Sequence, residues 1–419
     1  MPKLSRRLLV GGAAGLALIG GGVMAARRPD RGGAHDDYFQ RLSRALAAAG
    51  LAEPRLVIDR GRLRQNIETV RTALAARNLP PRIVVKSLPA HGLLNEIAAQ
   101  LRTDRFMVFN GAMLAEMARA HPQADLLLGK PLPVLQAAQF LDARIEGARP
   151  QWLIDTPARL AQYEEIARAR DQHLRVSFEI DVGLHRGGFA DPQALAAALS
   201  AARASPHVEI AGLMGYDPHV PRVPNSDHAW RQSQAAYAAA IEVIRAHVDD
   251  PARLILNGAG SPTYTLHAAR GTAANDIALG SAFVQPIGFD LESLAAHVPA
   301  SFIATPVIKA LARTEVPGLE GMAPIFRFLD PNTARAFFIY GGHWMARPVS
   351  PPGLEYNGLM GRSSNQELLT GSEGVDLEPD DFVFFRPEQS EAVFLQFGDL
   401  IVYENDTIAE RWPTFPVSA

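Results

Sequence analysis

The sequence lacks cysteine altogether: none of its 419 residues is Cys. This absence excludes disulfides, thiolate nucleophiles, cysteine-based zinc sites, iron–sulfur clusters and attachment of lipid to a cysteine. An excess of charge of one sign is also absent, because 41 Lys and Arg residues stand against 44 Asp and Glu residues. A chain without a basic excess has no general attraction for nucleic acid, and we predict no nucleic-acid partner.

The composition is that of an ordinary globular protein. Hydrophobic residues make up 47% of the chain and charged residues 20%, which excludes disorder of the whole chain. The length predicts two domains, or one barrel with an appended module. An enzyme that works through Lys, His, Tyr, carboxylates or a cofactor is compatible with all of these features.

Residues 1–30 are predicted to be an export signal. Arg6 and Arg7 precede a Gly- and Ala-rich apolar run that ends at Arg27-Arg28-Pro29, which is the layout of a signal peptide. The run is only mildly hydrophobic, so it would make a poor membrane-spanning helix, and the paired arginines resemble a twin-arginine signal. We expect a periplasmic protein that is exported already folded. The alternative is an uncleaved membrane anchor.

Short β-rich runs alternate with Ala-rich helical runs over residues 38–300. This alternation predicts βα units on a parallel sheet, and seven or eight such units fit a TIM-type (β/α)8 barrel. An open dinucleotide-binding sheet is disfavoured because no G-x-G-x-x-G follows the first strand. The predicted strands are Leu56–Asp59, Arg82–Val85, Arg105–Phe109, Asp125–Leu128, Gln151–Ile154, Leu174–Ile180, Glu209–Met214 and Leu254–Asn257. The predicted helices are Tyr38–Ala49, Arg62–Ala76, Leu93–Leu101, Thr156–Arg170, Pro192–Ala202 and Ala229–His247.

The sequence pattern changes near Ser301. Pro and Gly become frequent, helical periodicity fades, and Asn405-Asp406 separates two alternating runs as a hairpin turn would. We therefore predict a C-terminal, mostly antiparallel β domain over residues 301–419. Its predicted strands are Ala336–Tyr340, Asp381–Phe385, Ala392–Gln396, Leu400–Tyr403 and Thr407–Arg411.

Lys86 stands where barrel enzymes place catalytic groups. It directly follows the apolar run Arg82–Val85, and barrels build their active sites at the C-terminal ends of strands. An amine in such a place suits imine-forming chemistry. The structural alternative is a lysine whose charged end simply reaches solvent at the end of a strand.

Three later strand ends also combine polar residues with glycine. They are Glu179–Phe189, Leu213–His219 and Asn257–Tyr264. The last is a Gly-rich turn whose backbone N–H groups, together with the hydroxyls of Ser261 and Thr263, would bind a phosphate. Late βα loops are where barrels commonly hold phosphate, although a Gly-rich turn by itself is more often only a turn.

Taken in order, several motifs resemble one family of enzymes. The motifs are Lys86, Asp181–Gly188, Gly258–Thr263, Asp276–Phe283 and the ending from Gly398 to Pro413. They resemble the fold-type III pyridoxal-phosphate enzymes with their alanine racemase N-terminal barrel, and most closely the D-threonine aldolase and D-serine dehydratase group. The resemblance runs from about Pro54 to Trp412. It implies pyridoxal 5'-phosphate as cofactor and Lys86 as its Schiff-base lysine. The implied cofactor-binding residues are Lys86, Arg186, Tyr216, Gly258, Gly260, Ser261, Thr263, Gly280 and Ser281.

The resemblance further implies a homodimer, in which the β domain closes the barrel mouth, often that of the neighbouring subunit. The candidates are Tyr340 and His343 as a second acid or base, and His219 and Arg347 as substrate contacts. Each has a structural alternative, in which the side chain stabilises its own loop. For Arg186 the alternative is a salt bridge with Asp181 or Glu179.

The sequence departs from that group where the group holds a divalent metal. The metal-binding His-x-Cys or His-x-Asp pair matches Gln389 and Glu391, with no His or Cys. Two residues apart on a strand, these side chains would share a face, and their oxygens suit a hard cation such as Mg²⁺ better than zinc. The alternatives are that they contact a partner chain, the substrate or nothing, so the use of a metal stays open.

The resemblance implies an enzyme that acts on a small amino acid, most often a D-amino acid. The implied reaction is that of a lyase, either aldol cleavage or deaminating elimination. An amino-acid racemase is the first alternative, because racemisation needs two opposed bases and no metal. A pyridoxal-phosphate-binding protein without catalysis is the second alternative.

Overall fold

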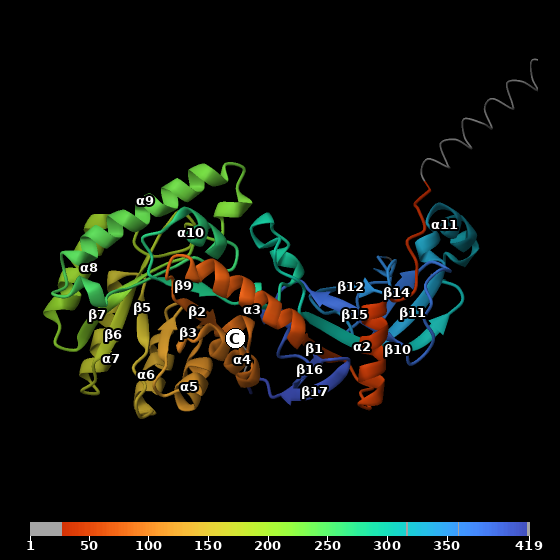
Figure 1. Ribbon diagram of the computed structural model, residues 1–419, viewed down its shortest axis with the longest axis horizontal. Coiled ribbons are helices and arrows are strands. Elements are labelled where there is room, and N and C mark those ends of the chain that lie inside the picture. The colour runs from red at the N-terminus through yellow and green to blue at the C-terminus, as the bar shows by residue number, and fades with distance from the viewer. Residues whose placement is uncertain (1–26, 316, 359, 417–419) are drawn as a thin grey trace, which may run out of the picture. The chain divides into compact units, whose positions relative to one another are not determined.

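The computed structural model describes residues 27–315, 317–358 and 360–416, and the chain divides into two compact units (Figure 1). The barrel unit comprises Ile58–Ser301, Glu388–Val402 and residues 410–416. The β unit comprises the described residues up to Val57, together with Phe302–Pro387 and Tyr403–Ala409. Each unit is therefore assembled from segments that lie far apart in the sequence.

Eight parallel strands close into a barrel, which confirms the predicted TIM-type fold. The last strand pairs with the first, with Pro81 opposite Ile277 and Ile83 opposite Leu279. The strands are β2 (Pro81–Val84), β3 (Arg105–Val108), β4 (Asp125–Leu128), β5 (Gln151–Ile154), β6 (Leu174–Ile180), β7 (Val208–Gly215), β8 (Ile255–Gly258) and β9 (Asp276–Leu279).

Helices surround the barrel strands (Figure 1). Several begin at a side chain that accepts a hydrogen bond from the first turn, as Asn110, Thr156 and Asp191 do. The helices are α3 (Arg60–Ala75), α4 (His91–Leu101), α5 (Gly111–Ala120), α6 (Val134–Asp142), α7 (Pro157–Arg168), α8 (Pro192–Ala204), α9 (Ser226–Arg245) and α10 (Tyr264–Arg270).

One predicted barrel strand belongs elsewhere. The run predicted as Leu56–Asp59 is β1 (Arg55–Asp59), which lies in the large sheet of the chain and not in the barrel. The eighth barrel strand is instead β9, which begins the motif Asp276–Phe283 and was not predicted as a strand. A short apolar run fits either kind of sheet, because its pairing partner is set by tertiary contacts.

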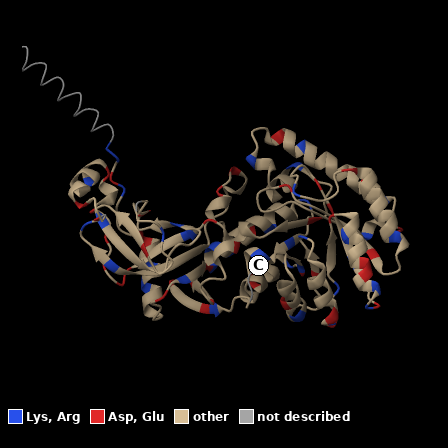
Figure 2. Ribbon diagram, turned by 180° about the vertical axis from the view of Figure 1, so that it is seen from behind, with Lys and Arg blue, Asp and Glu red and all other residues tan. Residues whose placement is uncertain are grey.

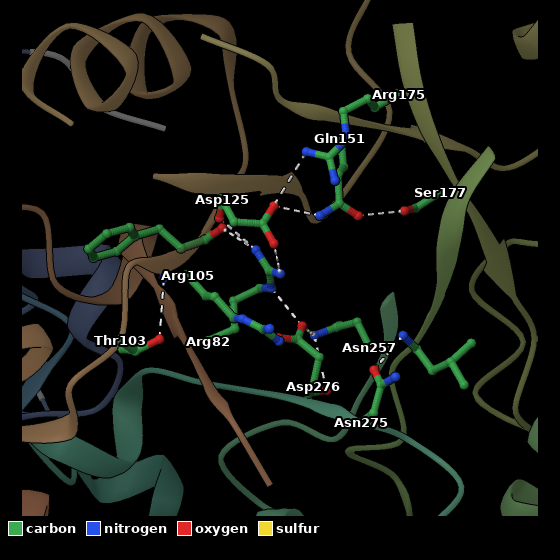
Figure 3. A network of polar contacts seen from close by, with 12 residues as sticks. Arg82, Thr103, Arg105, Asp125, Gln151, Arg175, Ser177, Asn257, Asn275 and Asp276 are labelled. Atoms are coloured by element: carbon green, nitrogen blue, oxygen red, sulfur yellow. Dashed lines mark hydrogen bonds and ion pairs between the residues drawn. The ribbon is translucent and has the colours of Figure 1, made fainter. Parts of the chain in front are cut away.

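A network of buried charges fills part of the barrel interior (Figure 3). Arg82 is fully buried, and it donates to Asp276 Oδ2 at 2.6 Å and to Asp125 Oδ2 at 3.0 Å. Asp276 also accepts from Arg105 at 2.9 Å and from Asn257 Nδ2 at 2.6 Å. Burial opposes the charge of the guanidinium, but the two carboxylates outweigh that effect and raise the pKa of Arg82. The barrel interior is thus held by ion pairs as well as by apolar side chains.

The large sheet has nine strands, and its pairings in the β unit are antiparallel: β10 with β11 and β15, β14 with β11 and β13, and β12 with β15. This confirms the predicted antiparallel β domain. The strands besides β1 are β10 (Ser301–Leu311), β11 (Arg335–Tyr340), β12 (Ala346–Ser350), β13 (Glu355–Tyr356), β14 (Gln366–Gly371), β15 (Phe382–Pro387), β16 (Leu400–Glu404) and β17 (Thr407–Trp412). Asn405 and Asp406 both have positive φ between β16 and β17, as the predicted hairpin turn requires.

Two predicted segments differ in the structure. The run Ala392–Gln396 is not a strand, because the chain turns into the short helix α12 (Ser390–Val393). Helix α2 (Asp37–Ala48), predicted as the start of the 38–300 domain, belongs to the β unit. Its Phe39 ring packs against Phe302 and Phe384 at centroid distances of 5.2 and 4.8 Å. Helix α11 (Ala323–Leu329) completes the β unit's helices among the described residues.

Basic and acidic residues are mixed along the helices and strands (Figure 2). Among the described residues, no helix combines the length and the apolar character that crossing a membrane requires. Residues 1–26 of the predicted export signal lie outside the described residues.

A buried histidine makes the stability of the barrel unit depend on pH. His297 is 5% exposed, and its Nε2 lies 2.5 Å from the hydroxyl of Tyr264. Burial lowers the pKa of His297 to about 4, whereas an unfolded histidine titrates near 6.5. As the pH falls below 6.5 the unfolded chain binds the proton first, so stability falls between pH 6.5 and 4.

We expect protonation linked to His297 to lower the free energy of unfolding by about 2 kcal/mol as the pH falls from 7 to 5. Urea denaturation at the two pH values measures the loss. His297→Gln keeps a hydrogen-bond acceptor without a titrating group, so the variant should lose less stability than the wild type. Equal losses in the two proteins would assign the pH dependence to other groups.

Candidate active site

A pocket opens at the C-terminal ends of the barrel strands, around Lys86. It contains about 570 Å³ of space that protein atoms do not fill, part of which is open to solvent. Val84, Gly215 and Leu279 line it from the last residues of β2, β7 and β9. The other lining residues are Lys86, Ser87, Met107, Phe109, Gly129, Arg186, Met214, Tyr216, Asn257, Ala259, Gly260, Ser261, Ala278, Gly280, Ser281, Phe289 and Glu391.

Lys86 projects from the short 3-10 turn Val85–Ser87 that follows β2. Its side chain is 33% exposed, and its Nζ lies 3.3 Å from Glu391 Oε1. The same nitrogen lies 4.8 Å from the centroid of the Phe109 ring, close enough for a cation–π contact. The lysine is therefore held at the pocket wall by one carboxylate and one aromatic face.

The Gly-rich turn after β8 is tied to the turn after β9 by one hydroxyl. Ser261 Oγ accepts the amides of Gly280 and Ala282, each at 3.1 Å. Both glycines in this region are needed for close packing: a Cβ on Gly260 would lie 2.4 Å from Tyr216, and one on Gly280 would lie 2.9 Å from Val84. The two turns thus form one rigid wall of the pocket.

Thr263 does not face the pocket. Its hydroxyl donates to Asp217 Oδ1 at 2.6 Å and accepts from the Gly260 amide at 3.2 Å. Asp217 is buried and also pairs with His267 Nε2 at 2.9 Å. Burial acts to raise the pKa of Asp217, but the contacts with His267 and Thr263 lower it overall. The geometry gives Thr263 the role of fixing the turn.

The Asp217–His267 pair was not predicted from the sequence. Asp217 stands in the polar segment Leu213–His219, but His267 in α10 offers no sequence signal. Gly258, predicted with the phosphate turn, is the buried end of β8 and lies behind the pocket lining. Its added Cβ would meet Ala274 at 3.0 Å.

Arg186 and Tyr216 also line the pocket and contact each other. The guanidinium carbon lies 4.8 Å from the Tyr216 ring centroid, and Arg186 Nη2 lies 4.0 Å from Glu179 Oε1. Asp181 instead contacts His185 at 2.8 Å. Burial raises the pKa of Glu179 and of Tyr216. The distant contact with Glu179 leaves the Arg186 charge available for a ligand.

His219 lies at the beginning of a 3-10 turn after β7, outside the lining of the pocket. Its ring approaches Gly183, where an added Cβ would lie 3.2 Å from Nε2. This places the predicted substrate contact behind the loop that follows β6.

The predicted metal pair does not share a face. Gln389 is exposed and immediately precedes α12, whereas Glu391 lies in its first turn and lines the pocket. The strand β15 ends at Pro387, so the alternation of a strand does not extend to these residues. Within residues 27–416 as described, no group of three or more His, Cys, Asp or Glu side chains is arranged to hold a metal ion.

The remaining predicted residues lie in the β unit. Tyr340, 45% exposed, ends β11, and Arg347 lies in β12. His343 has a φ of +58°, and its amide donates at 2.6 Å to Glu367, whose carboxylate also binds Arg362. Glu367 is buried, and its hydrogen bond to the His343 amide fixes the loop that carries His343. This contact was not predicted from the sequence.

Comparison with protein families matches residues 58–284, more than half of the chain, to the alanine racemase N-terminal domain. The chain belongs to this family. The family match begins beside Asp59 and ends after the turn that carries Gly280 and Ser281. It therefore covers every barrel strand.

A curated relative of the same family is an alanine racemase from Acidithiobacillus ferrooxidans. It is 28% identical over 208 residues, which are 48% of this chain and 53% of that protein. The match thus spans about half the length of that relative.

Solved structures share the fold over 86–87% of this chain. A D-threonine aldolase from Filomicrobium marinum matches with a TM-score of 0.69 and 17% identity, covering 86% of this chain and 96% of that one. A D-threo-3-hydroxyaspartate dehydratase from Delftia sp. HT23 matches with a TM-score of 0.70 and 16% identity, covering 87% and 97%. An alanine racemase of Clostridium difficile 630 matches with a TM-score of 0.64 and 13% identity, covering 87% and 99%.

Proposed function

We propose that this family member is a pyridoxal-phosphate-dependent lyase that acts on small D-amino acids, by aldol cleavage or deaminating elimination. The observation that carries the proposal is Lys86 in a pocket that is also lined by the paired turns of Ser261 and Gly280. The shared fold with an aldolase and a dehydratase, over nearly their full lengths, supports the choice of a lyase.

The pocket fits the cofactor on chemical grounds. Lys86 would hold it covalently through Nζ. Ser261, whose oxygen already accepts two amides, has its hydroxyl proton directed away from both and would donate it to a phosphate. The missing Cβ atoms of Gly260 and Gly280 let the backbone approach closely. Uptake of the electron pair from the substrate bond that breaks is the chemistry that the bound cofactor supplies.

The side chains around the pocket have distinct tasks in this proposal. Lys86, once released as an amine, accepts or returns the proton at the substrate Cα. Arg186 binds a carboxylate through its paired N–H donors. Tyr216 stays neutral because burial raises its pKa, so it serves as a hydrogen-bond donor. Phe109 and Met107 exclude water from the same space.

We further propose that the protein is exported to the periplasm by the twin-arginine signal and acts as a homodimer. The exposed Tyr340 and Met345, 45% and 48% exposed, flank the fixed loop of His343, which supports a contact between subunits there. Association with the membrane would follow only if the signal stayed attached.

Amino-acid racemisation is the second candidate, favoured by the match to a curated alanine racemase. It would require a second base, for which Tyr340 and His343 are the candidates. A substrate panel separates the two reactions: D- and L-forms of serine, threonine and alanine, each with and without a chelator. Release of a keto acid or an aldehyde supports the lyase. Deuterium uptake from solvent with loss of optical activity and no cleavage product contradicts it and supports the racemase.

Thr263→Val tests the anchoring of the phosphate turn. The substitution keeps the shape but removes the hydroxyl that links Asp217 to the Gly260 amide. We expect the dissociation constant for pyridoxal phosphate to rise about tenfold, the cost of one buried hydrogen-bond link. Absorbance titration of the apoprotein measures it. The control is Thr69→Val, on the exposed face of α3, which should bind as the wild type does. An unchanged constant in Thr263→Val would contradict the anchoring role.

A further inference from the structure

Glu391 presents a carboxylate to the nitrogen on which the proposed chemistry depends. Its Oε1 lies 3.3 Å from Lys86 Nζ, and its side chain lines the pocket with 25% of its surface exposed. The carboxylate thus forms part of the pocket wall beside Lys86.

The other oxygen of the same carboxylate is anchored to the protein. Ser390 Oγ donates to Glu391 Oε2 at 3.2 Å. Ser390 is fully buried, and its hydroxyl lies 3.5 Å from that of Ser281, which in turn donates to Ser87 at 3.2 Å. Ser390 thus fixes Glu391 Oε2, whereas Oε1 faces Lys86 and the pocket.

The charged and titratable groups that share this pocket with Glu391 are Lys86, Arg186 and Tyr216. The Glu391 charge contributes to the raised pKa of Tyr216, after the larger effect of burial. The carboxylate therefore acts electrostatically across the pocket as well as on Lys86.

A role for Glu391 follows from its position beside Lys86. This inference rests on the proposed function, in which Lys86 is the base at the substrate Cα. Lys86 Nζ must reach the substrate Cα, and Cβ is one bond, about 1.5 Å, further on. The Glu391 carboxylate, which lies beside Lys86 Nζ, is therefore near the substituent that the substrate carries on Cβ. Once Lys86 is released as an amine to accept the Cα proton, it no longer offers Glu391 an ammonium donor, and a hydroxyl on Cβ provides a replacement.

We propose that Glu391 is the catalytic acid–base for the β-hydroxyl of the substrate. In aldol cleavage, the hydroxyl O–H bond breaks and an O–H bond forms at Glu391 Oε1. The O–H electron pair becomes the second bond of the aldehyde C=O, while the Cα–Cβ pair stays at Cα, where the bound cofactor would take it up. In elimination, Lys86 accepts the Cα proton and the Cα–H electron pair becomes the second bond between Cα and Cβ. The hydroxyl accepts a proton from protonated Glu391 and leaves with the C–O pair as water.

Glu391→Gln separates this role from others. With D-threonine and D-serine, release of aldehyde or keto acid should fall by about 10²- to 10⁴-fold, the usual contribution of a positioned acid or base. Exchange of the Cα hydrogen of D-alanine with deuterated solvent, followed by NMR, should change less than about threefold, because that substrate has no hydroxyl for Glu391 to serve. Binding, read from the change in visible absorbance, should weaken about tenfold for D-serine and little for D-alanine.

The matched control is Glu209→Gln, an exposed carboxylate of β7 that pairs with Arg149 and should leave every readout unchanged. Glu391→Ala provides a second variant, in which added formate should restore part of the cleavage. Equal loss of D-alanine exchange and of cleavage would overturn the proposal and make Glu391 a partner of Lys86 alone. Unchanged cleavage in Glu391→Gln would also overturn it. The two Glu391→Gln outcomes above overturn this inference only, because the wild-type protein still cleaves hydroxy amino acids. A wild-type protein that exchanges D-alanine but transforms no hydroxy amino acid, or one without bound cofactor, overturns the proposed lyase function too.

Discussion

Lys86→Ala is expected to lose the visible absorbance of bound cofactor and to lower turnover of any amino-acid substrate by at least about 10³-fold. The reason is that Lys86 supplies both the covalent attachment and the amine beside the substrate Cα. Absorbance of the purified protein and borohydride trapping, followed by mass analysis of the peptide that carries residue 86, measure the first effect. Product release measures the second.

Two variants make this result specific. Lys86→Arg keeps a cation opposite Glu391 but cannot bond the cofactor, so it should fail as Lys86→Ala does. Lys130→Ala removes an exposed lysine next to Gly129 of the pocket wall and should retain both absorbance and activity. If Lys86→Ala kept the absorbance band, the lysine would be structural and the proposed function would be wrong.

Arg82→Met is expected to destabilise the barrel unit by roughly 3–5 kcal/mol, because removing one partner of a buried ion pair leaves the others uncompensated. Asp276 is fully buried and would keep only Arg105 and Asn257 as partners (Figure 3). Urea denaturation of the variant and the wild type at pH 7 measures the difference.

The control for this prediction is Arg71→Met, which breaks the exposed pair of Arg71 with Glu68 on α3 and should leave the unfolding free energy unchanged within error. Asn257 links the Arg82 network to the pocket, since it lines the pocket and donates to Asp276. We therefore expect Arg82→Met also to bind the cofactor less tightly. A stability equal to that of the wild type would show that methionine fills the barrel as well as the ion pairs do.

The fold could be predicted from the sequence because its strands and helices have strong local patterns of apolar and polar residues. Asp125–Leu128, Gln151–Ile154 and Leu174–Ile180 were predicted with the bounds observed, since short apolar runs between amphipathic helices have few other interpretations. The errors came from pairing. Neither β1 nor β9 carries a local signal for the sheet that it joins, because any extended apolar run can pair with several partners.

The site was predictable in part. Lys86, Arg186, Tyr216, Gly260, Ser261, Gly280 and Ser281 were all named from sequence and all line one pocket, because a barrel brings the C-terminal ends of its strands together. The position of Thr263 in that turn was predicted, but the direction of its hydroxyl depends on Asp217, 46 residues earlier in the chain. The catalytic roles of Tyr340 and His343 and the substrate contact of Arg347 stay predictions.

By itself, the sequence determined the absence of thiol chemistry, the order of barrel and β domain, and the lysine at a strand end. These are properties of residue type and of local periodicity. Only the tertiary structure decided that Glu391 leaves the expected strand, enters α12 and faces Lys86, and that Arg82 is enclosed by two aspartates. Such contacts join residues separated by 43 to 305 positions, and no local pattern encodes a distance across the folded chain.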